Sequence, residues 1–143
     1  MFDTIVVATD GSQHGERAFA LAQSMARGGS SRLFVVHVTE IVGGKGGMFP
    51  VAADEDEIRR SLADAVDKLQ ADGVAAELIL QPIRLGGPAH VIAEIAESVQ
   101  ADLIVVGSRG HSLLGEVLLG GVPVRLLQLA RRPVLVVPPV TAP

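Results

Sequence analysis

The sequence alternates short apolar runs with segments of helical period, and this alternation leaves few folds open to the chain. Five runs are rich in Val, Ile and Leu and contain no regular polar alternation: Thr4–Thr9, Leu33–Val38, Ala75–Leu80, Leu103–Val106 and Val134–Val137. Such runs are typical of strands buried on both faces, as in a parallel sheet.

Apolar residues at helical spacing fill the intervals between these runs, within 18–25, 58–69, 91–99 and 124–130. Gly28 and Gly73 follow the first two segments as stop signals, and Pro88 suits the first turn of the third. The resulting βαβαβαβαβ order predicts a doubly wound parallel sheet of the α/β class with helices on both faces. In the strand order 3-2-1-4-5, the first and fourth strands flank the switch point where ligands bind.

The length of 143 residues fits a single domain, and no linker divides 1–143. The tail 138–143 is expected to be unstructured. The connection 40–54 contains a glycine-rich stretch, Gly43-Gly44-Lys45-Gly46-Gly47, and is expected to be mobile. Two interpretations of this segment stay open, a lid over a ligand site and a disordered insertion.

Composition excludes several classes of function. The chain has no cysteine, which excludes disulfides and thiolate chemistry. The net charge is −4, and the chain has four Phe and no Trp or Tyr. It therefore lacks the positive charge and the stacking surfaces that nucleic-acid binding requires, and we expect no nucleic-acid partner. No apolar stretch is long enough for a membrane span, and the first residues do not resemble a signal peptide, so we expect a cytoplasmic protein without a membrane partner.

The strongest functional signal is a glycine-spaced loop, Gly107-x2-Gly110-x9-Gly120-Gly121, which leads into the last helix. Glycine lets a ligand approach the backbone closely, and the N–H groups of a helix start favour phosphate. The alternative is that these glycines serve only a loop and a helix start. In the expected topology this loop faces the end of the first strand, Ala8-Thr9-Asp10-Gly11-Ser12, across one crevice.

Two charged residues near this crevice, Asp10 and Arg109, have two interpretations each. Asp10 is a candidate ligand of ribose hydroxyls or adenine, and it is also a candidate cap of the first helix. Arg109 is either a phosphate ligand or a solvated arginine, and His111 lies within the glycine loop. His37 falls inside a strand, where we expect a hydrogen-bonded core residue.

The familiar catalytic devices are missing from the sequence. It contains no G-x-x-x-x-G-K-[ST] loop, and the first strand is not followed by G-x-G-x-x-G. Neither a Ser-His-Asp order nor a carboxylate cluster with metal spacing stands out, so we predict no catalytic residues and no metal ligands.

Taken together, several motifs resemble the universal stress protein family over essentially the whole chain. They are Val7-Ala8-Thr9-Asp10-Gly11-Ser12, Val36-His37-Val38, Gly87-Pro88-Ala89, the glycine spacing from Gly107 to Gly120, and Arg132-Pro133-Val134-Leu135-Val136-Val137.

The resemblance implies a Rossmann-like five-stranded sheet with strand order 3-2-1-4-5, a homodimer formed through Val134–Val137, and binding of ATP with or without Mg²⁺. Asp10 would contact the nucleoside and Val38 would pack near adenine. The phosphates would be surrounded by four glycines, and neighbouring residues complete the expected nucleotide-binding set: Gly107, Gly110, Gly120 and Gly121, with Ala8, Thr9, Ser108, Arg109 and Val122.

The chain departs from the family's ATP-binding pattern after the third glycine. The pattern has Ser or Thr there, whereas this chain has Gly121, and Pro123 replaces a second frequent hydroxyl residue. One lost charge-assisted hydrogen bond costs roughly 1.5–3 kcal/mol. Three functions stay open for this chain: an ATP-binding regulatory stress protein, a nucleotide-free dimer that acts through partners, and a slow ATPase.

Overall fold

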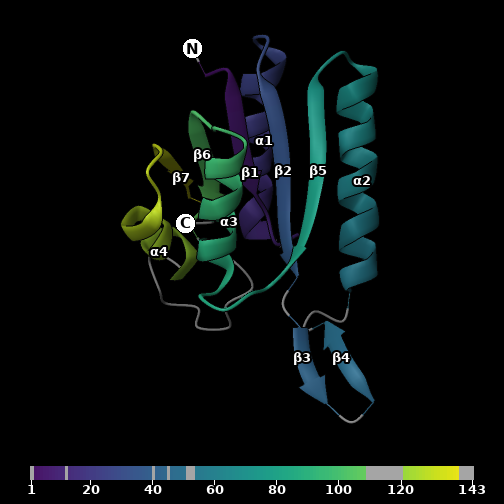
Figure 1. The fold of residues 1–143 in the computed structure, drawn as a ribbon. Helices are drawn as coiled ribbons and strands as arrows, with labels where there is room; N and C mark the ends of the chain where they lie inside the picture. The colour runs from purple at the N-terminus through teal and green to yellow at the C-terminus, as the bar shows by residue number, and fades with distance from the viewer. Residues whose placement is uncertain are drawn as a thin grey trace, which may run out of the picture.

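The computed structural model describes residues 2–11, 13–39, 41–44, 46–50, 54–108 and 121–138. Its largest element is a sheet of five parallel strands: β1 (Thr4–Ala8), β2 (Arg32–Thr39), β5 (Ala75–Pro82), β6 (Leu103–Gly107) and β7 (Val134–Val137). The strands lie in the order β5-β2-β1-β6-β7 (Figure 1). Counting only these five strands along the chain, the order is 3-2-1-4-5, and the predicted topology is confirmed.

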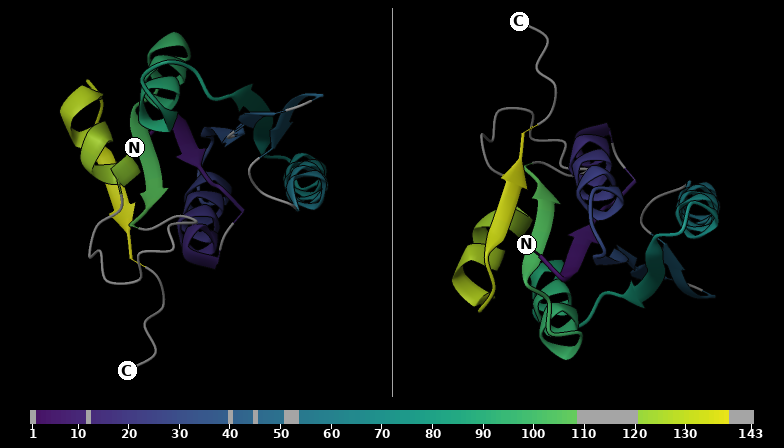
Figure 2. Two further views of the ribbon diagram at one scale, coloured as in Figure 1. Left: turned by 90° about the horizontal axis from the view of Figure 1, so that it is seen from below. Right: turned by 90° about the horizontal axis from the view of Figure 1, so that it is seen from above.

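Four helices connect the strands: α1 (Gln13–Arg27), α2 (Glu55–Ala71), α3 (Pro88–Ser98) and α4 (Gly121–Leu129). Viewed along the strands, α1 and α2 cover one face of the sheet, and α3 and α4 cover the other (Figure 2). The sheet is thus doubly wound, as the sequence predicts.

Helix α2 shows how the local sequence sets an element and its ends. Its buried apolar residues, Ile58, Leu62, Val66 and Leu69, form one stripe along the helix. The first turn is acidic and the last turn carries Lys68, which matches the helix dipole at both ends. The helix ends at Ala71, and Gly73, two residues later, has a φ of +87°. Its N–H donates to the Gln70 carbonyl, and the next N–H donates to the Leu69 carbonyl, which satisfies two terminal acceptors.

The core consists of two apolar layers, one on each face of the sheet. Ile5 and Val7 of β1 point toward α1 and α2, whereas Val6 points toward α3 and α4. All three side chains are fully buried, as expected for a central strand covered on both faces. This double coverage explains the apolar runs of β1, β2 and β6. The expectation of burial on both faces is wrong for β5, an edge strand in which Leu80 is 38% exposed, and the edge strand β7 is partly exposed at three of its four residues.

The segment that follows β2 corrects one expectation. It forms an antiparallel hairpin of β3 (Ile41–Gly44) and β4 (Gly47–Pro50), so a disordered insertion is wrong for these residues. Two glycines with φ of +100° and +130°, Gly46 and Gly47, lie at the turn. In Figure 1 the hairpin extends beyond the lower ends of β2 and α2, away from the main sheet.

Two further expectations lie outside the described residues, those on the greater part of the glycine loop, 109–120, and on the end of the tail, 139–143. Among the helices of the described ranges, none combines the length and the apolar character that crossing a membrane requires.

Candidate functional site

The carboxyl ends of β2, β1 and β6 lie side by side, and several predicted site residues lie at or just beyond these ends. The strand pairing sets Ala8 level with Val36 of β2 and Val106 of β6, which are two positions before Val38 and Ser108. By this register, Val38 of β2, Asp10 two residues beyond β1 and Ser108 one residue beyond β6 fall at corresponding positions, in one row at the carboxyl end of the sheet. The sequence predicts that Asp10 and the start of the glycine loop face each other at this edge, and their contacts with a ligand stay a prediction.

The turn after β1 is held by one hydrogen bond to β2 and one to its own side chain. The Thr9 N–H donates to the Val36 carbonyl at 3.0 Å, which extends the ladder one residue beyond the strand. The Gly11 N–H donates to Thr9 Oγ1 at 3.2 Å. Gly11 has a φ of +78°, a conformation that glycine adopts without strain. These contacts hold the backbone on both sides of Asp10.

The Asp10 carboxylate lies beside the first turn of α1. A Cβ placed on Gly15 would be 3.5 Å from Asp10 Oδ1 and 3.0 Å from Thr9 Oγ1. The side chain is half-buried. This placement is compatible with both readings of Asp10, as a ligand for nucleoside hydroxyls and as a partner of the helix start.

His37 is a hydrogen-bonded core residue, as the sequence predicts. Its ring is 3% exposed and lies between the end of β1 and the first turn of α2. The Nδ1 atom is 2.9 Å from the Thr9 carbonyl oxygen, and Nε2 is 2.8 Å from each carboxylate oxygen of Glu55. Glu55 is itself 4% exposed, so the two ionisable groups form a buried pair.

Arg59 extends this pair on α2. Its Nε is 3.9 Å from Glu55 Oε2, and its guanidinium donates to Thr39 Oγ1 at 2.9 Å. Sequence reasoning missed Glu55 and Arg59. The sequence did contain a signal, because a histidine inside a buried strand needs a polar partner. Glu55 is the first residue of α2, on the side of the sheet that His37 faces.

The expected phosphate side is described in part. Gly107 ends β6, and Ser108 is buried, with its N–H donating to the Val137 carbonyl at 2.9 Å. Gly121 opens α4, and a Cβ added to it would meet no atom of the described residues within 4 Å. Pro123 is buried in the first turn of α4, the position that proline tolerates in a helix. Arg109, Gly110, Gly120 and His111 lie outside the described residues.

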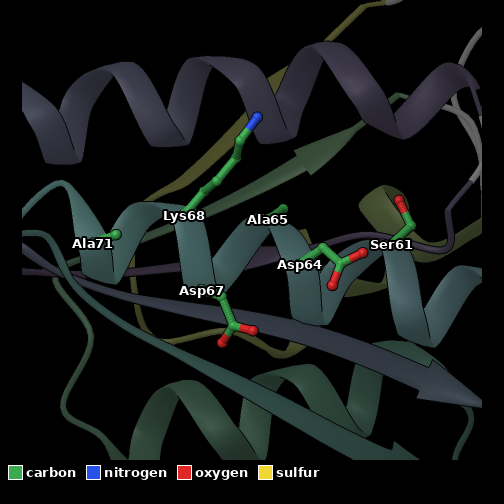
Figure 3. Close-up of a pocket in the computed structure, with 6 residues that line it drawn as sticks. All are labelled: Ser61, Asp64, Ala65, Asp67, Lys68 and Ala71. Atoms are coloured by element: carbon green, nitrogen blue, oxygen red, sulfur yellow. The ribbon is translucent and has the colours of Figure 1, made fainter.

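An open hollow also lies along α2, at a distance from the strand ends. It is lined by six residues of this one helix, shown in Figure 3: Ser61, Asp64, Ala65, Asp67, Lys68 and Ala71. The surroundings are two carboxylates and one ammonium on an exposed helix surface, which is the usual composition of a solvated face. None of the predicted site residues contributes to this hollow.

Comparison with known proteins identifies relatives along almost the whole chain. The model of the universal stress protein family matches residues 1–138. A universal stress protein of Thermus aquaticus is 37% identical over 140 residues, which cover 96% of this chain and 99% of the relative.

Solved structures agree with this assignment. A universal stress protein in complex with cAMP is 30% identical, with a TM-score of 0.65 over 96% of this chain and 98% of the other. The universal stress protein from Archaeoglobus fulgidus in complex with dAMP is 29% identical, with a TM-score of 0.62 over 93% and 95% of the two chains. From the extent of the family match and the identity to the Thermus relative, the chain belongs to the universal stress protein family.

Proposed function

We propose that this universal stress protein binds an adenine nucleotide, ATP in the first place, and acts as a nucleotide-dependent regulatory protein in the stress response. The observation that carries the proposal is the row of Val38, Asp10 and Ser108 at the carboxyl ends of three adjacent parallel strands. Ligands of open α/β sheets bind at this edge, where the strand order reverses. Two related proteins of known structure bind the adenine nucleotides cAMP and dAMP.

The nucleoside half of the site suits adenosine. Val38 is a partly buried apolar residue at the end of β2, which fits contact with a flat base. Asp10 supplies a carboxylate for ribose hydroxyls, and Ala8 and Thr9 form the strand end beside it. The carboxylate would repel phosphates, so the phosphates belong at the other end of the crevice.

The phosphate half combines the end of β6 with the start of α4. Gly107 has no side chain, and the first N–H groups of α4 from Gly121 and Val122 have no partners within the helix. Helix starts of this kind stabilise phosphate through the helix dipole. Arg109, Gly110 and Gly120 remain predicted phosphate neighbours, and Mg²⁺, where present, would be held chiefly by phosphate oxygens.

Titration calorimetry with ATP tests the proposal, using two matched aspartates. Asp10→Ala removes the carboxylate at the strand end, and Asp64→Ala makes the same change in the α2 hollow. We expect Asp10→Ala to weaken binding roughly tenfold or more, since one charge-assisted hydrogen bond is lost, and Asp64→Ala to bind like the wild type. No binding by the wild type at millimolar ATP would refute the proposal. Equal affinities of the two variants would show that Asp10 does not contribute to the ATP site.

We also propose that the protein forms a homodimer through β7. Among the described strands, β7 lies at the edge of the sheet and pairs only with β6. Val134, Leu135 and Val136 are each partly exposed there. A second copy pairing with β7 would cover the apolar edge and its unpaired backbone groups. A cytoplasmic location stays a prediction from the sequence, which cell fractionation tests.

A further inference from the structure

The geometry of the His37–Glu55 pair requires a proton between the two side chains. A carbonyl oxygen only accepts hydrogen bonds, so the His37 Nδ1 that contacts the Thr9 carbonyl must carry a hydrogen. On the other side of the ring, Nε2 faces two carboxylate oxygens at 2.8 Å, and a second proton must lie between them. The pair therefore exists as imidazolium with carboxylate, or as neutral imidazole with a protonated carboxyl.

This contact fixes the peptide that leads into Asp10. The carbonyl of Thr9 and the N–H of Asp10 belong to one planar peptide unit. His37 holds that unit through the carbonyl, while the Thr9 N–H is held by the Val36 carbonyl at 3.0 Å. Both anchors come from β2. The direction in which Asp10 leaves the sheet is thus set by hydrogen bonds on both sides of Thr9.

The first turn of α2 contacts the same segment a second time. Ile58, one turn after Glu55, approaches the backbone of Gly11 so closely that an added Cβ would be 2.7 Å from its Cγ2. Glu55 acts on the residue before Asp10 through His37, and Ile58 packs against the residue after it. Asp10 is therefore flanked on both sides by residues that α2 holds in place.

Stability alone does not explain a buried ionisable pair. The desolvation of two buried ionisable groups offsets much of their attraction, and two apolar side chains often stabilise a core equally well. An apolar pair would, however, provide no donor for the Thr9 carbonyl. The specific contribution of His37 is that donor, and the contribution of Glu55 is to hold the ring and its proton.

We propose that His37 is a positioning residue for nucleoside binding, which sets the Thr9–Asp10 peptide while Glu55 fixes the ring. The proposal rests on the adenine-nucleotide site described above. It assigns to His37 no contact with the ligand. Its effect on affinity passes through the orientation of Asp10.

Three variants separate positioning from charge and from folding. In Glu55→Gln the amide can donate to Nε2 of a neutral imidazole, which keeps both ring contacts and needs no shared proton. Adding His37→Asn to Glu55→Gln places an amide nitrogen near the position of Nδ1 and keeps the Thr9 contact. Adding His37→Gln instead places the nitrogen near Nε2, which keeps the contact with residue 55 and loses the one with Thr9. Denaturation of each variant reports its stability separately.

The experiment is an ATP titration by calorimetry together with amide hydrogen exchange at Asp10 and Gly11 in the nucleotide-free protein. We expect Glu55→Gln and Glu55→Gln/His37→Asn to bind within about threefold of the wild type, and Glu55→Gln/His37→Gln to bind roughly tenfold more weakly, as for one lost hydrogen bond. The two amides should exchange faster in the His37→Gln double variant than in the His37→Asn one.

Equal affinity of the two folded double variants, with a wild type that binds ATP, would overturn the positioning role and leave the proposed function intact. A wild type that binds no nucleotide would refute the proposed function instead. The exchange rates alone would then decide whether His37 sets the Thr9–Asp10 peptide. Equal exchange in the two double variants would show that His37 does not set this peptide.

Discussion

The backbone of Gly11 lies directly against the side chain of Ile58, so that a Cβ at residue 11 would be 2.7 Å from Ile58 Cγ2. Gly11 also has a φ of +78°. The turn after β1 is therefore shaped by two separate requirements, a backbone conformation and a lack of space. Both meet beside Asp10, where the proposed nucleoside site lies.

Gly11→Ala should destabilise the protein more than a glycine substitution that introduces strain alone. Gly73→Ala is the matched control, because Gly73 has a φ of +87° and no atom within 4 Å of an added Cβ. We expect backbone strain to lower the free energy of unfolding by about 1–2 kcal/mol in both variants. Overpacking against Ile58 should lower it by about 1–3 kcal/mol more in Gly11→Ala. Urea denaturation measures both, and equal losses would contradict the close contact.

Gly121→Ser should strengthen ATP binding. A Cβ at residue 121 would meet no atom of the described part of the chain within 4 Å, and a serine hydroxyl restores the group that the family's ATP-binding pattern has after the third glycine. We expect a gain of roughly tenfold in affinity from one hydrogen bond to a phosphate oxygen. Gly121→Ala is the control, since it changes the backbone in the same way without adding a hydroxyl. Equal affinities of the serine and alanine variants would place the phosphates elsewhere.

Asp102 should contribute to stability by holding the start of β1. Its Oδ2 accepts the N–H groups of Asp3 and Thr4, each at 2.9 Å. Asp102→Ala removes both hydrogen bonds, and we expect a loss of about 1–2 kcal/mol in a partly exposed site. Asp102→Asn keeps an oxygen acceptor and should lose less. Chemical denaturation compares the three proteins, and an alanine variant as stable as the wild type would disprove the anchoring role.

The proposed dimer should depend on the open side of β7. The carbonyls of Pro133 and Val137 accept hydrogen bonds from β6, so by strand alternation the backbone of Val136 faces the open edge. Val136→Pro removes that outward N–H while leaving the pairing groups toward β6 in place. We expect a dimer for the wild type and a monomer for the variant in analytical ultracentrifugation. A monomeric wild type would rule out the interface.

The main sheet could be predicted from the sequence because each strand carries its own signal. β1 and β6 are apolar on both faces, and only a parallel sheet covered by helices buries both. The hairpin β3–β4 was missed because its glycines resemble those of a flexible connection, and the pairing of Ile41 with Pro50 is visible only in three dimensions.

The grouping of the candidate site residues could be predicted in part for a related reason. Val38 lies near the end of β2, and Asp10 and Ser108 lie just beyond β1 and β6, so the topology brings these strand ends to one edge of the sheet. The sequence signals that His37 needs a polar partner, but the choice of Glu55 depends on how α2 lies across the sheet. Contacts set by strand register are therefore predictable here, while contacts set by helix placement are not.

NMR mapping of ATP binding on the backbone amides is the sharpest test of the proposed adenine-nucleotide site at the ends of β1, β2 and β6. We expect saturable shifts at Asp10, Gly11 and Val38, and at Ser108 and Gly121 on the phosphate side. The residues of the α2 hollow, Ser61 to Ala71, should not shift. Shifts confined to that hollow, or none at millimolar ATP, would refute the proposed site.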